Sequence, residues 1–320
     1  MTAALLAPVG WAWQAAGWLR AARTRSVTAP VPVLCIGNLT AGGGGKTPMA
    51  VACLMRLAGR GVTAHLVSRG YGGRIKGPHR VDPTRDRAAD VGDEPLLLAS
   101  YAPVWVSRDR AAGALEAAKT GAEIVLLDDG FQNPGLSKDA SILMVDAGQG
   151  FGNGRVIPAG PLREPVADGL ARADLVILVG PPASRSAAIA RWPELANALS
   201  AEMVVPETGL DLSGQRVVAF AGIARPEKFF ETLRSQGAML VRAEGFADHR
   251  PYARKMLDRL QATALQQGAM LVTTEKDATR LPPAFRREVM ALPVRLEPSD
   301  WAPIDRIFAK LAAKPPSGDR

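Results

Sequence analysis

Cysteine and histidine are scarce in this sequence. Its 320 residues include two cysteines, too few for a disulfide framework, and three histidines that lie far apart. No group of cysteines and histidines has the spacing of metal ligands, and Cys35 falls within an apolar run, where a thiol is typical of core packing. The sequence therefore excludes a disulfide-stapled domain, and a reducing compartment is expected.

Aromatic residues are also few, at 5% of the chain, and no RNA-recognition or zinc-finger pattern is present. Basic residues nevertheless outnumber acidic ones by 39 to 31, which gives a net charge of +8. Such a chain favours anionic partners, and guanidinium groups suit phosphate because they donate two parallel hydrogen bonds. We therefore expect phosphates or acidic lipid headgroups as partners, and no nucleic acid.

The first 19 residues carry no charged side chain. They include three tryptophans and are followed by Arg20, Arg23 and Arg25. A secretory signal would place its positive charge before the apolar run, and a transmembrane span would be longer and more apolar. Indole and guanidinium groups both favour the membrane interface. Residues 1–30 are therefore predicted to form a membrane-associating helix, with a helix packed on the protein or a true span as alternatives.

Beyond residue 30, short apolar runs alternate with segments of helical spacing. The runs at 31–39, 62–67, 124–127 and 175–179 are continuous, which indicates strands buried on both faces. Strands that alternate with helices form parallel β-α-β units, so an α/β fold is expected. A proline-containing break follows at 181–214, after which the alternation restarts.

A glycine-rich segment follows the first apolar run and precedes a predicted helix, which is the context of a phosphate-binding P-loop. Its glycines let successive backbone N–H groups point at phosphate oxygens, and the helix N-terminus adds positive potential. Lys46 would reach the β- and γ-phosphates, and the Thr47 hydroxyl would bind Mg²⁺. The match is imperfect, because Thr40 stands where the common pattern has glycine. The candidate phosphate-binding residues are Thr40, Ala41, Gly42, Gly43, Gly44, Gly45, Lys46 and Thr47.

The apolar run at 124–127 ends in Asp128 and Asp129. A buried strand that delivers an acid at its carboxyl end is the Walker B arrangement, which places a carboxylate near Mg²⁺. The alternative is a tight turn, which Asp-Asp-Gly also favours. The guanine-specificity motif is absent, because Thr-Glu-Lys-Asp at 274–277 has the wrong spacing, so ATP is expected rather than GTP.

Together these features predict an α/β protein with two domains. A mostly parallel sheet of the P-loop nucleoside-triphosphatase type is expected over residues 31–208, and a second, smaller α/β domain over 209–320.

These motifs, with others in the same order, resemble the tetraacyldisaccharide 4'-kinase family of lipid A kinases. Singly the matching segments are short, but together they extend from residue 31 to about 280 and form a specific set. They are the P-loop region at 37–48, Ser-Arg-Gly-Tyr-Gly-Gly at 68–73, Gly-Asp-Glu-Pro at 92–95, Asp-Asp-Gly-Phe-Gln at 128–132, Pro-Ala-Gly-Pro-Leu-Arg-Glu at 158–164, Asp-His at 248–249 and Thr-Thr-Glu-Lys-Asp-Ala at 273–278.

The resemblance implies a P-loop kinase that transfers the γ-phosphoryl group of ATP, with Mg²⁺, to the 4'-hydroxyl of a tetraacyldisaccharide 1-phosphate. The product would be lipid IVA in lipopolysaccharide biosynthesis. The expected place is the cytoplasmic face of the inner membrane, and no obligate protein partner is evident. An ATP-switched, membrane-recruited ATPase is one alternative, disfavoured because Ala41 stands where partitioning ATPases have lysine. A non-catalytic nucleotide-binding regulator is another.

The resemblance also implies roles for single side chains. Asp93 is the expected base for the acceptor hydroxyl, supported by His249 from the second domain. From the residues alone, Asp93 could instead be a helix N-cap and His249 a surface imidazole. Because His249 has to reach the first domain, a hinge near residue 208 is expected. Lys46, Asp128 and Asp129 complete the set of expected catalytic residues. The sequence does not assign separate roles to the two carboxylates.

Two further groups of residues are expected to bind the reactants. The candidate Mg²⁺ ligands are Thr47, Asp128, Asp129 and Glu164. The candidate contacts for the sugar or its 1-phosphate are Arg69, Tyr71, Arg108 and Arg110, with plain surface charge as the alternative. Arg69 and Tyr71 lie in a glycine-rich loop after a predicted strand, which is where α/β proteins gather their binding sites.

Overall fold

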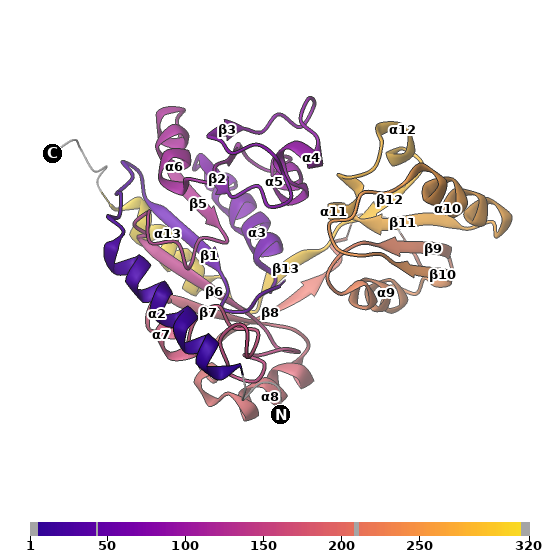
Figure 1. Ribbon diagram of the computed structural model, residues 1–320. Helices are drawn as coiled ribbons and strands as arrows, with labels where there is room; N and C mark the ends of the chain where they lie inside the picture. Colours follow the sequence, from indigo (N-terminus) through magenta and orange to yellow (C-terminus); the bar gives the residue numbers. More distant parts are fainter. Residues whose placement is uncertain (1–5, 43, 208–210, 315–320) are drawn as a thin grey trace.

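The structure is a computed structural model, and it describes residues 6–42, 44–207 and 211–314. Gly43, the first five residues of the N-terminal segment and the expected boundary between residues 208 and 209 lie outside the described residues. The chain forms two units, each built around one sheet, and an N-terminal helix that lies beside the larger unit (Figure 1).

The larger unit contains a nine-stranded sheet in the order β13-β8-β7-β6-β1-β5-β2-β4-β3. The strand pairs are parallel except at the two edges, where β3 and β13 run antiparallel to their neighbours. The central strands are buried throughout, which is why their sequences do not alternate. The strands are β1 (Val33–Gly37), β2 (Ala64–Ser68), β3 (His79–Arg80), β4 (Val104–Val106), β5 (Ile124–Asp128), β6 (Ala140–Asp146), β7 (Leu175–Val179), β8 (Leu199–Val204) and β13 (Arg295–Pro298).

Helices cover both faces of this sheet, and each face has its own core. Leu34 and Ile36 of β1 pack in one core, together with α3, whereas Val33 and Cys35 pack in the other, together with α6. The α/β fold expected from the sequence is thus confirmed. The helices are α3 (Lys46–Ala58), α4 (Ala88–Val91), α5 (Asp93–Leu98), α6 (Arg110–Lys119), α7 (Val166–Ala171), α8 (Pro182–Arg191), the 3₁₀ turn η1 (Pro193–Leu195) and α13 (Ala302–Ala312).

The smaller unit has a four-stranded parallel sheet in the order β10-β9-β11-β12. Helix α9 packs on one face through Phe230 and Leu233, and helix α10 packs on the other through Leu257 and Leu260. The strands are β9 (Arg216–Ala221), β10 (Met239–Gly245), β11 (Met270–Thr274) and β12 (Met290–Leu292), and the helices are α9 (Pro226–Ser235), α10 (Arg254–Gln266), α11 (Glu275–Ala278) and α12 (Pro283–Arg286).

The end of the chain returns to the larger unit, which corrects the expected extent of the second domain over 209–320. Strand β13 pairs with β8 at the edge of the nine-stranded sheet, and Ile304 and Phe308 of α13 enter the same core as α3. The smaller unit is therefore inserted between β8 and β13, and the chain crosses between the units twice (Figure 1). The apolar pattern of β13 could not predict this, because a short buried strand has the same sequence pattern in either sheet.

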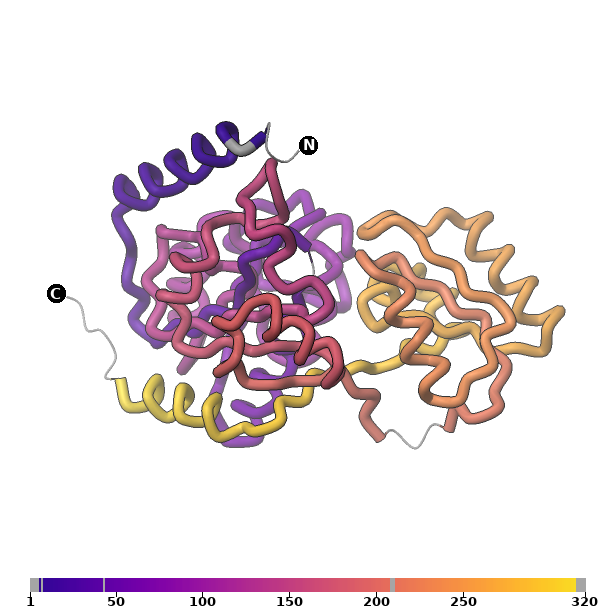
Figure 2. The backbone as a smooth tube through the Cα atoms, turned by 90° about the horizontal axis from the view of Figure 1, so that it is seen from below, coloured from indigo at the N-terminus to yellow at the C-terminus, as the bar shows by residue number. Residues whose placement is uncertain are grey.

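Helix α2 (Ala7–Arg23) runs along the outside of the larger unit (Figure 2). The indole N–H of Trp18 donates a hydrogen bond to Asp168 at 3.3 Å, and Gly10 lies against the backbone of Val156. Trp11 and Trp13 are 69% and 55% exposed. Among the described residues, no helix is long and apolar enough to cross a membrane.

Candidate active site

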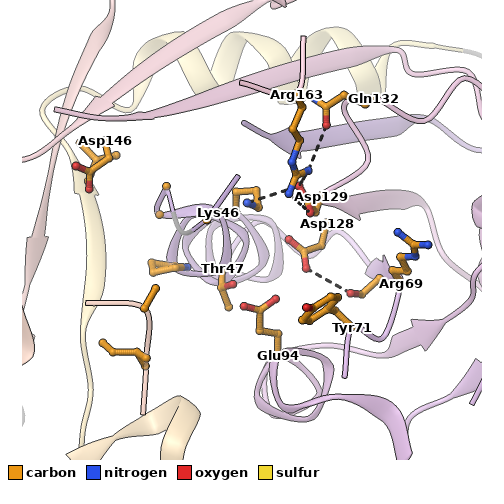
Figure 3. A pocket seen from close by; sticks show the side chains of 18 of the residues that line it. Lys46, Thr47, Arg69, Tyr71, Glu94, Asp128, Asp129, Gln132, Asp146 and Arg163 are labelled. Carbon is orange, nitrogen blue, oxygen red and sulfur yellow. Dashed lines mark hydrogen bonds and ion pairs between the residues drawn. The ribbon is translucent and has the colours of Figure 1, made fainter. Parts of the chain in front are cut away.

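The carboxyl ends of the central strands open into one cleft of about 2470 Å³ (Figure 3). Ligands of open α/β sheets bind at this edge, where the loops that follow the strands converge. Both units line the cleft. The larger one supplies Lys46, Thr47, Ser68, Glu94, Asp128, Asp129 and Asp146, and the smaller one supplies Arg225, Lys228, Asp248, His249 and Lys276.

The glycine-rich segment joins β1 to α3, as the sequence predicted. Gly42 and Gly45 have φ values of 111° and 82°, a backbone conformation that side chains with a Cβ rarely adopt. The Asn38 side chain donates to the carbonyl oxygen of Gly42 at 2.9 Å and so fixes the curl of the loop. Lys46 and Thr47 form the first turn of α3 and line the cleft. Asn38 is not among the site residues predicted from the sequence. The only indication of its role there is that it belongs to the segment at 37–48, which resembles the P-loop region of the kinase family.

Asp129 holds two cations at the floor of the cleft. Its carboxylate accepts two hydrogen bonds from the Arg163 guanidinium, at 2.8 and 3.1 Å, and lies 3.5 Å from Nζ of Lys46. Burial opposes ionisation of Asp129, but the charges of Lys46 and Arg163 hold its pKa below the usual value. Its φ of 51° is unusual for a residue other than glycine and is typical of functional turns. Arg163, which sequence reasoning gave no role, therefore positions Asp129.

Asp128 ends β5 and points into the space between Lys46, Thr47 and Glu94 (Figure 3). One carboxylate oxygen accepts a hydrogen bond from Ser68 at 3.4 Å, and the other has no hydrogen-bond partner among the described residues. Burial, with the charges of Glu94 and Asp129, raises the pKa of Asp128 to about 7 against the opposing charge of Lys46. A buried carboxylate oxygen without a partner is the feature that a bound cation would satisfy.

The cleft offers the donors that Mg²⁺ prefers, namely the hydroxyl of Thr47 and the carboxylates of Asp128 and Asp129. Over residues 6–42, 44–207 and 211–314, no group of three or more histidine, cysteine, aspartate or glutamate side chains could hold a metal ion by itself. Phosphate oxygens of a bound nucleotide would complete such a site, as in other P-loop proteins. Glu164 lines the same cleft, but Gln132 donates to one of its oxygens at 2.8 Å and Arg172 contacts the other.

Asp93 and His249 meet across the two units, although they are 156 positions apart. Nδ1 of His249 lies 2.9 and 3.1 Å from the two carboxylate oxygens of Asp93, whose side chain is only 4% exposed. Asp93 is the first residue of α5 and Gly92 is its N-cap, so Asp93 does not take the N-cap position. His249 has a φ of 58°, which indicates that the backbone is held in this conformation by its surroundings.

Each member of this pair stabilises the charged form of the other. Burial opposes ionisation of Asp93, but the hydrogen bond from His249 and the nearby positive charges keep its pKa below the usual value. The same hydrogen bond raises the pKa of His249, against burial and the charge of Lys276. Asp93 is thus an ionised, buried carboxylate at the contact between the units, next to Glu94 and His249, which line the cleft.

Two basic side chains of the smaller unit surround this pair. Nζ of Lys276 lies 3.1 Å from Glu94 and 3.9 Å from Asp93, and Nε of Arg280 lies 3.7 Å from Asp93. Burial acts against the charge of Lys276, but the neighbouring carboxylates raise its pKa. Neither residue was predicted for the site. The sequence signal for Lys276 is its place in the segment at 273–278, which belongs to the family resemblance and has the wrong spacing for a guanine motif; Arg280 lies outside that segment.

The four expected substrate contacts all line the same cleft. The Tyr71 ring meets the imidazole of His249 edge to face, with centroids 5.3 Å apart. Arg110 is 5% exposed, donates to the carbonyl of Ser107 at 3.0 Å, and has no partner for its Nε among the described residues. The alternative of plain surface charge is therefore wrong for Arg110.

Known proteins resemble this chain over nearly its whole length. The family model described as tetraacyldisaccharide-1-P 4'-kinase matches residues 2–312. The tetraacyldisaccharide 4'-kinase of Dinoroseobacter shibae is 54% identical over 314 residues, which cover 95% of this chain and 92% of that protein. That of Rhodospirillum rubrum is 51% identical over 314 residues, with coverage of 96% and 94%.

Among solved structures, LpxK from Aquifex aeolicus, crystallised in complex with ATP, superposes with a TM-score of 0.75 and 24% identity, over 97% of this chain and 99% of that one. At this identity the likeness shows the fold. The family model and the sequence relatives together show more: this chain belongs to the tetraacyldisaccharide 4'-kinase family.

Proposed function

We propose that this chain transfers the γ-phosphoryl group of ATP to the 4'-hydroxyl of a tetraacyldisaccharide 1-phosphate, which gives lipid IVA. The observation that carries the proposal is that one cleft holds both halves of such a reaction. The P-loop, Asp128 and Asp129 line it from the larger unit, and His249, whose imidazole contacts the buried Asp93, lines it from the smaller unit. Membership of the family supplies the identity of the acceptor.

On the nucleotide side, the proposed task of the protein is to hold the phosphates and neutralise their charge. Backbone N–H groups of residues 40–45 cradle the phosphates, and Lys46 reaches the β- and γ-phosphates. Bound Mg²⁺ would withdraw charge from the transferring group, with Thr47, Asp128 and Asp129 as the proposed ligands. Arg163 keeps Asp129 ionised and oriented through its two hydrogen bonds.

On the acceptor side, Asp93 takes the proton of the sugar hydroxyl as the phosphoryl group arrives. An ionised carboxylate suits this step, because it accepts a proton without first losing one. His249 holds the carboxylate in place through its two short contacts. Arg69, Tyr71, Arg108 and Arg110 are proposed to bind the sugar or its 1-phosphate, since all four line the cleft beside the pair.

The acylated substrate enters from a membrane surface, and α2 is proposed to rest on that surface. Trp11 and Trp13 are exposed on this helix, and Arg20 and Arg23 lie in its last turn, which is the composition of an interfacial helix. Part of α2 also lines the cleft, so a lipid held by the helix would lie next to the site. We place the protein at the cytoplasmic face of the inner membrane, where ATP is present.

The reaction is tested by mass spectrometry of an acylated disaccharide 1-phosphate incubated with the protein and Mg-ATP. The expected result is a product heavier by one phosphate group, with the phosphate on the second sugar. Lys46→Ala serves as the control and should lose several orders of magnitude in rate. ATP hydrolysis that needs no lipid would favour the ATPase alternative, and nucleotide binding without turnover would favour the regulator.

The membrane proposal has a separate test. The double variant Trp11→Ser with Trp13→Ser removes two exposed indoles without touching the Trp18–Asp168 hydrogen bond. Its binding to vesicles of anionic phospholipid should fall several-fold, while its affinity for ATP should not change. Equal vesicle binding by the variant and the parent protein would place the membrane contact elsewhere.

A further inference from the structure

The Thr-Glu-Lys-Asp segment at 274–277 has no role in the function proposed so far, yet its lysine reaches the reacting pair. Lys276 belongs to α11, which docks on α5 of the larger unit. Its ammonium group lies 3.4 Å from Nε2 of His249, which is the imidazole nitrogen that faces away from Asp93. The same ammonium donates to Glu94 at 3.1 Å.

The hydrogen-bonding partners decide which nitrogen of His249 carries the proton. Asp93 is ionised and has no proton to give, so the contacts at 2.9 and 3.1 Å require an N–H on Nδ1. In the neutral imidazole, Nε2 then carries the lone pair. An ammonium group has three N–H donors and no lone pair, so Lys276 can only donate to Nε2.

A second proton on Nε2 would place two positive N–H groups face to face across this 3.4 Å contact. The neighbouring carboxylates instead favour a second proton on the imidazole of His249. Asp93 lies at Nδ1, Asp248 lies 3.6 Å from Nε2, and Glu94 lies 3.1 Å from Lys276. Arg280 approaches Asp93 from behind at 3.7 Å, and Tyr71 covers one side of the ring. Lys276 is thus the one described group whose contact with His249 engages the Nε2 lone pair as a donor.

We propose that Lys276 is a positioning residue that engages the Nε2 lone pair of His249, whose Nδ1 proton is fixed by Asp93, and so assigns the roles within the pair. With its Nε2 lone pair engaged by Lys276, the imidazole cannot take the proton of the acceptor hydroxyl. The carboxylate of Asp93 is left as the proton acceptor, and the O–H bond that breaks becomes a new O–H bond on Asp93. This inference rests on the proposed kinase function, but the state of His249 can be measured without any turnover.

The test compares two variants with a matched control. Lys276→Met removes the donor, and Lys276→Arg keeps both donor and charge. Arg295→Met removes a different cation from the same contact between the units, where Arg295 donates to Glu275 and Tyr101. The readout is the ¹⁵N spectrum of labelled imidazoles, which contains signals from only three histidines.

Above the pKa of His249, the parent protein should show Nδ1 protonated and Nε2 unprotonated, and so should the Arg variant and the control. Lys276→Met should raise the pKa of His249 and lower kcat by about tenfold or more, with little change in KM for the lipid, while Asp93 keeps the proton on Nδ1. Lys276→Arg should recover most of that loss.

A parent protein with the Nε2–H tautomer would overturn the proposal, and so would a Lys276→Met variant in which the pKa of His249 is unchanged. Equal kinetic losses in Lys276→Met and Arg295→Met, without a change at His249, would reduce Lys276 to a docking contact. A parent protein that binds Mg-ATP and never phosphorylates the disaccharide would refute the kinase function, while the spectra would still decide the role of Lys276.

Discussion

Two of the polar contacts between the units, taken over the described residues, differ in character. On the acceptor side, His249, Lys276 and Arg280 converge on Asp93, and the side chains of Asp93 and Arg280 are 4% and 5% exposed. On the nucleotide side, Asp146 at the end of β6 binds Arg225 at 2.6 Å and Lys228 at 2.9 Å. The side chains of these two cations are 39% and 53% exposed.

The difference in burial indicates a difference in use. Removing one member of a buried cluster leaves an uncompensated charge in the interior, which is costly. The cluster therefore holds its geometry strongly. Exposed cations exchange partners with water and anions at little cost. The acceptor-side contact is therefore suited to hold Asp93 in one position, whereas the nucleotide-side contact is suited to open and close beside the P-loop.

The largest effect is expected from Asp93→Ala. If Asp93 accepts the hydroxyl proton, kcat should fall by about 10²–10⁴-fold, and the affinity for ATP should change little because the base acts only in the transition state. Steady-state kinetics with the acylated disaccharide at saturating Mg-ATP would measure both. A normal kcat would leave Asp93 with a purely structural role in the buried contact.

A double-mutant cycle tests whether the buried pair acts as a unit. His249→Ala should lower kcat less than Asp93→Ala, roughly ten- to a hundredfold, because the imidazole only supports the carboxylate. The double variant should then be hardly slower than Asp93→Ala alone. The quantity compared is kcat/KM for the lipid. Additive losses would show that His249 acts on its own, for example on a substrate phosphate.

The pH dependence of the buried contact follows from its two pKa shifts. The pKa of Asp93 is lowered and that of His249 is raised, so their attraction stabilises the fold between these two values. It is lost as pH falls through the lowered pKa of Asp93, and as pH rises through the raised pKa of His249. Asp93→Asn should therefore bring the pKa of His249 down, as followed by NMR titration of its imidazole. If the pKa of His249 were the same in the variant and the parent protein, groups other than Asp93 would be responsible for raising it.

The smallest effect is expected from Asp146→Asn on the nucleotide side. Its partners are exposed, so the free energy of unfolding should change by roughly 0–1 kcal/mol, and less at high salt. A urea titration at two salt concentrations would measure this. A loss as large as that caused by disrupting the buried pair would remove the distinction between the two contacts.

The sequence predicts well those parts whose signal is local. The continuous apolar runs located the central strands, and the glycines before Lys46 located the phosphate loop, because a strand, a curled backbone and a helix start are each encoded within a few residues. Strand β8 was not predicted. Its Ser200 and Glu202 interrupt the apolar run within a proline-containing segment that was interpreted as a break.

What the sequence could not predict are contacts that depend on distant packing. Lys276 and Arg280 become site residues only because α11 docks on α5, and nothing within their own segment reveals that neighbour. The pairing of Asp93 with His249 came from the family resemblance, and the geometry then placed the two side chains in contact. The expected division at 209–320 was wrong at its far end because β13 completes a sheet whose other strands all precede the inserted unit.

The late return of the chain sets the order in which the protein is completed during synthesis. Leu296 of β13 packs beside Gly45 of the phosphate loop, and Asp305 of α13 binds Arg56 of α3 and Arg60, which lies just after that helix. These supports leave the ribosome only after the whole inserted unit. A nascent chain therefore carries a complete smaller unit before β13 and α13 can support its phosphate loop and the helix that follows it.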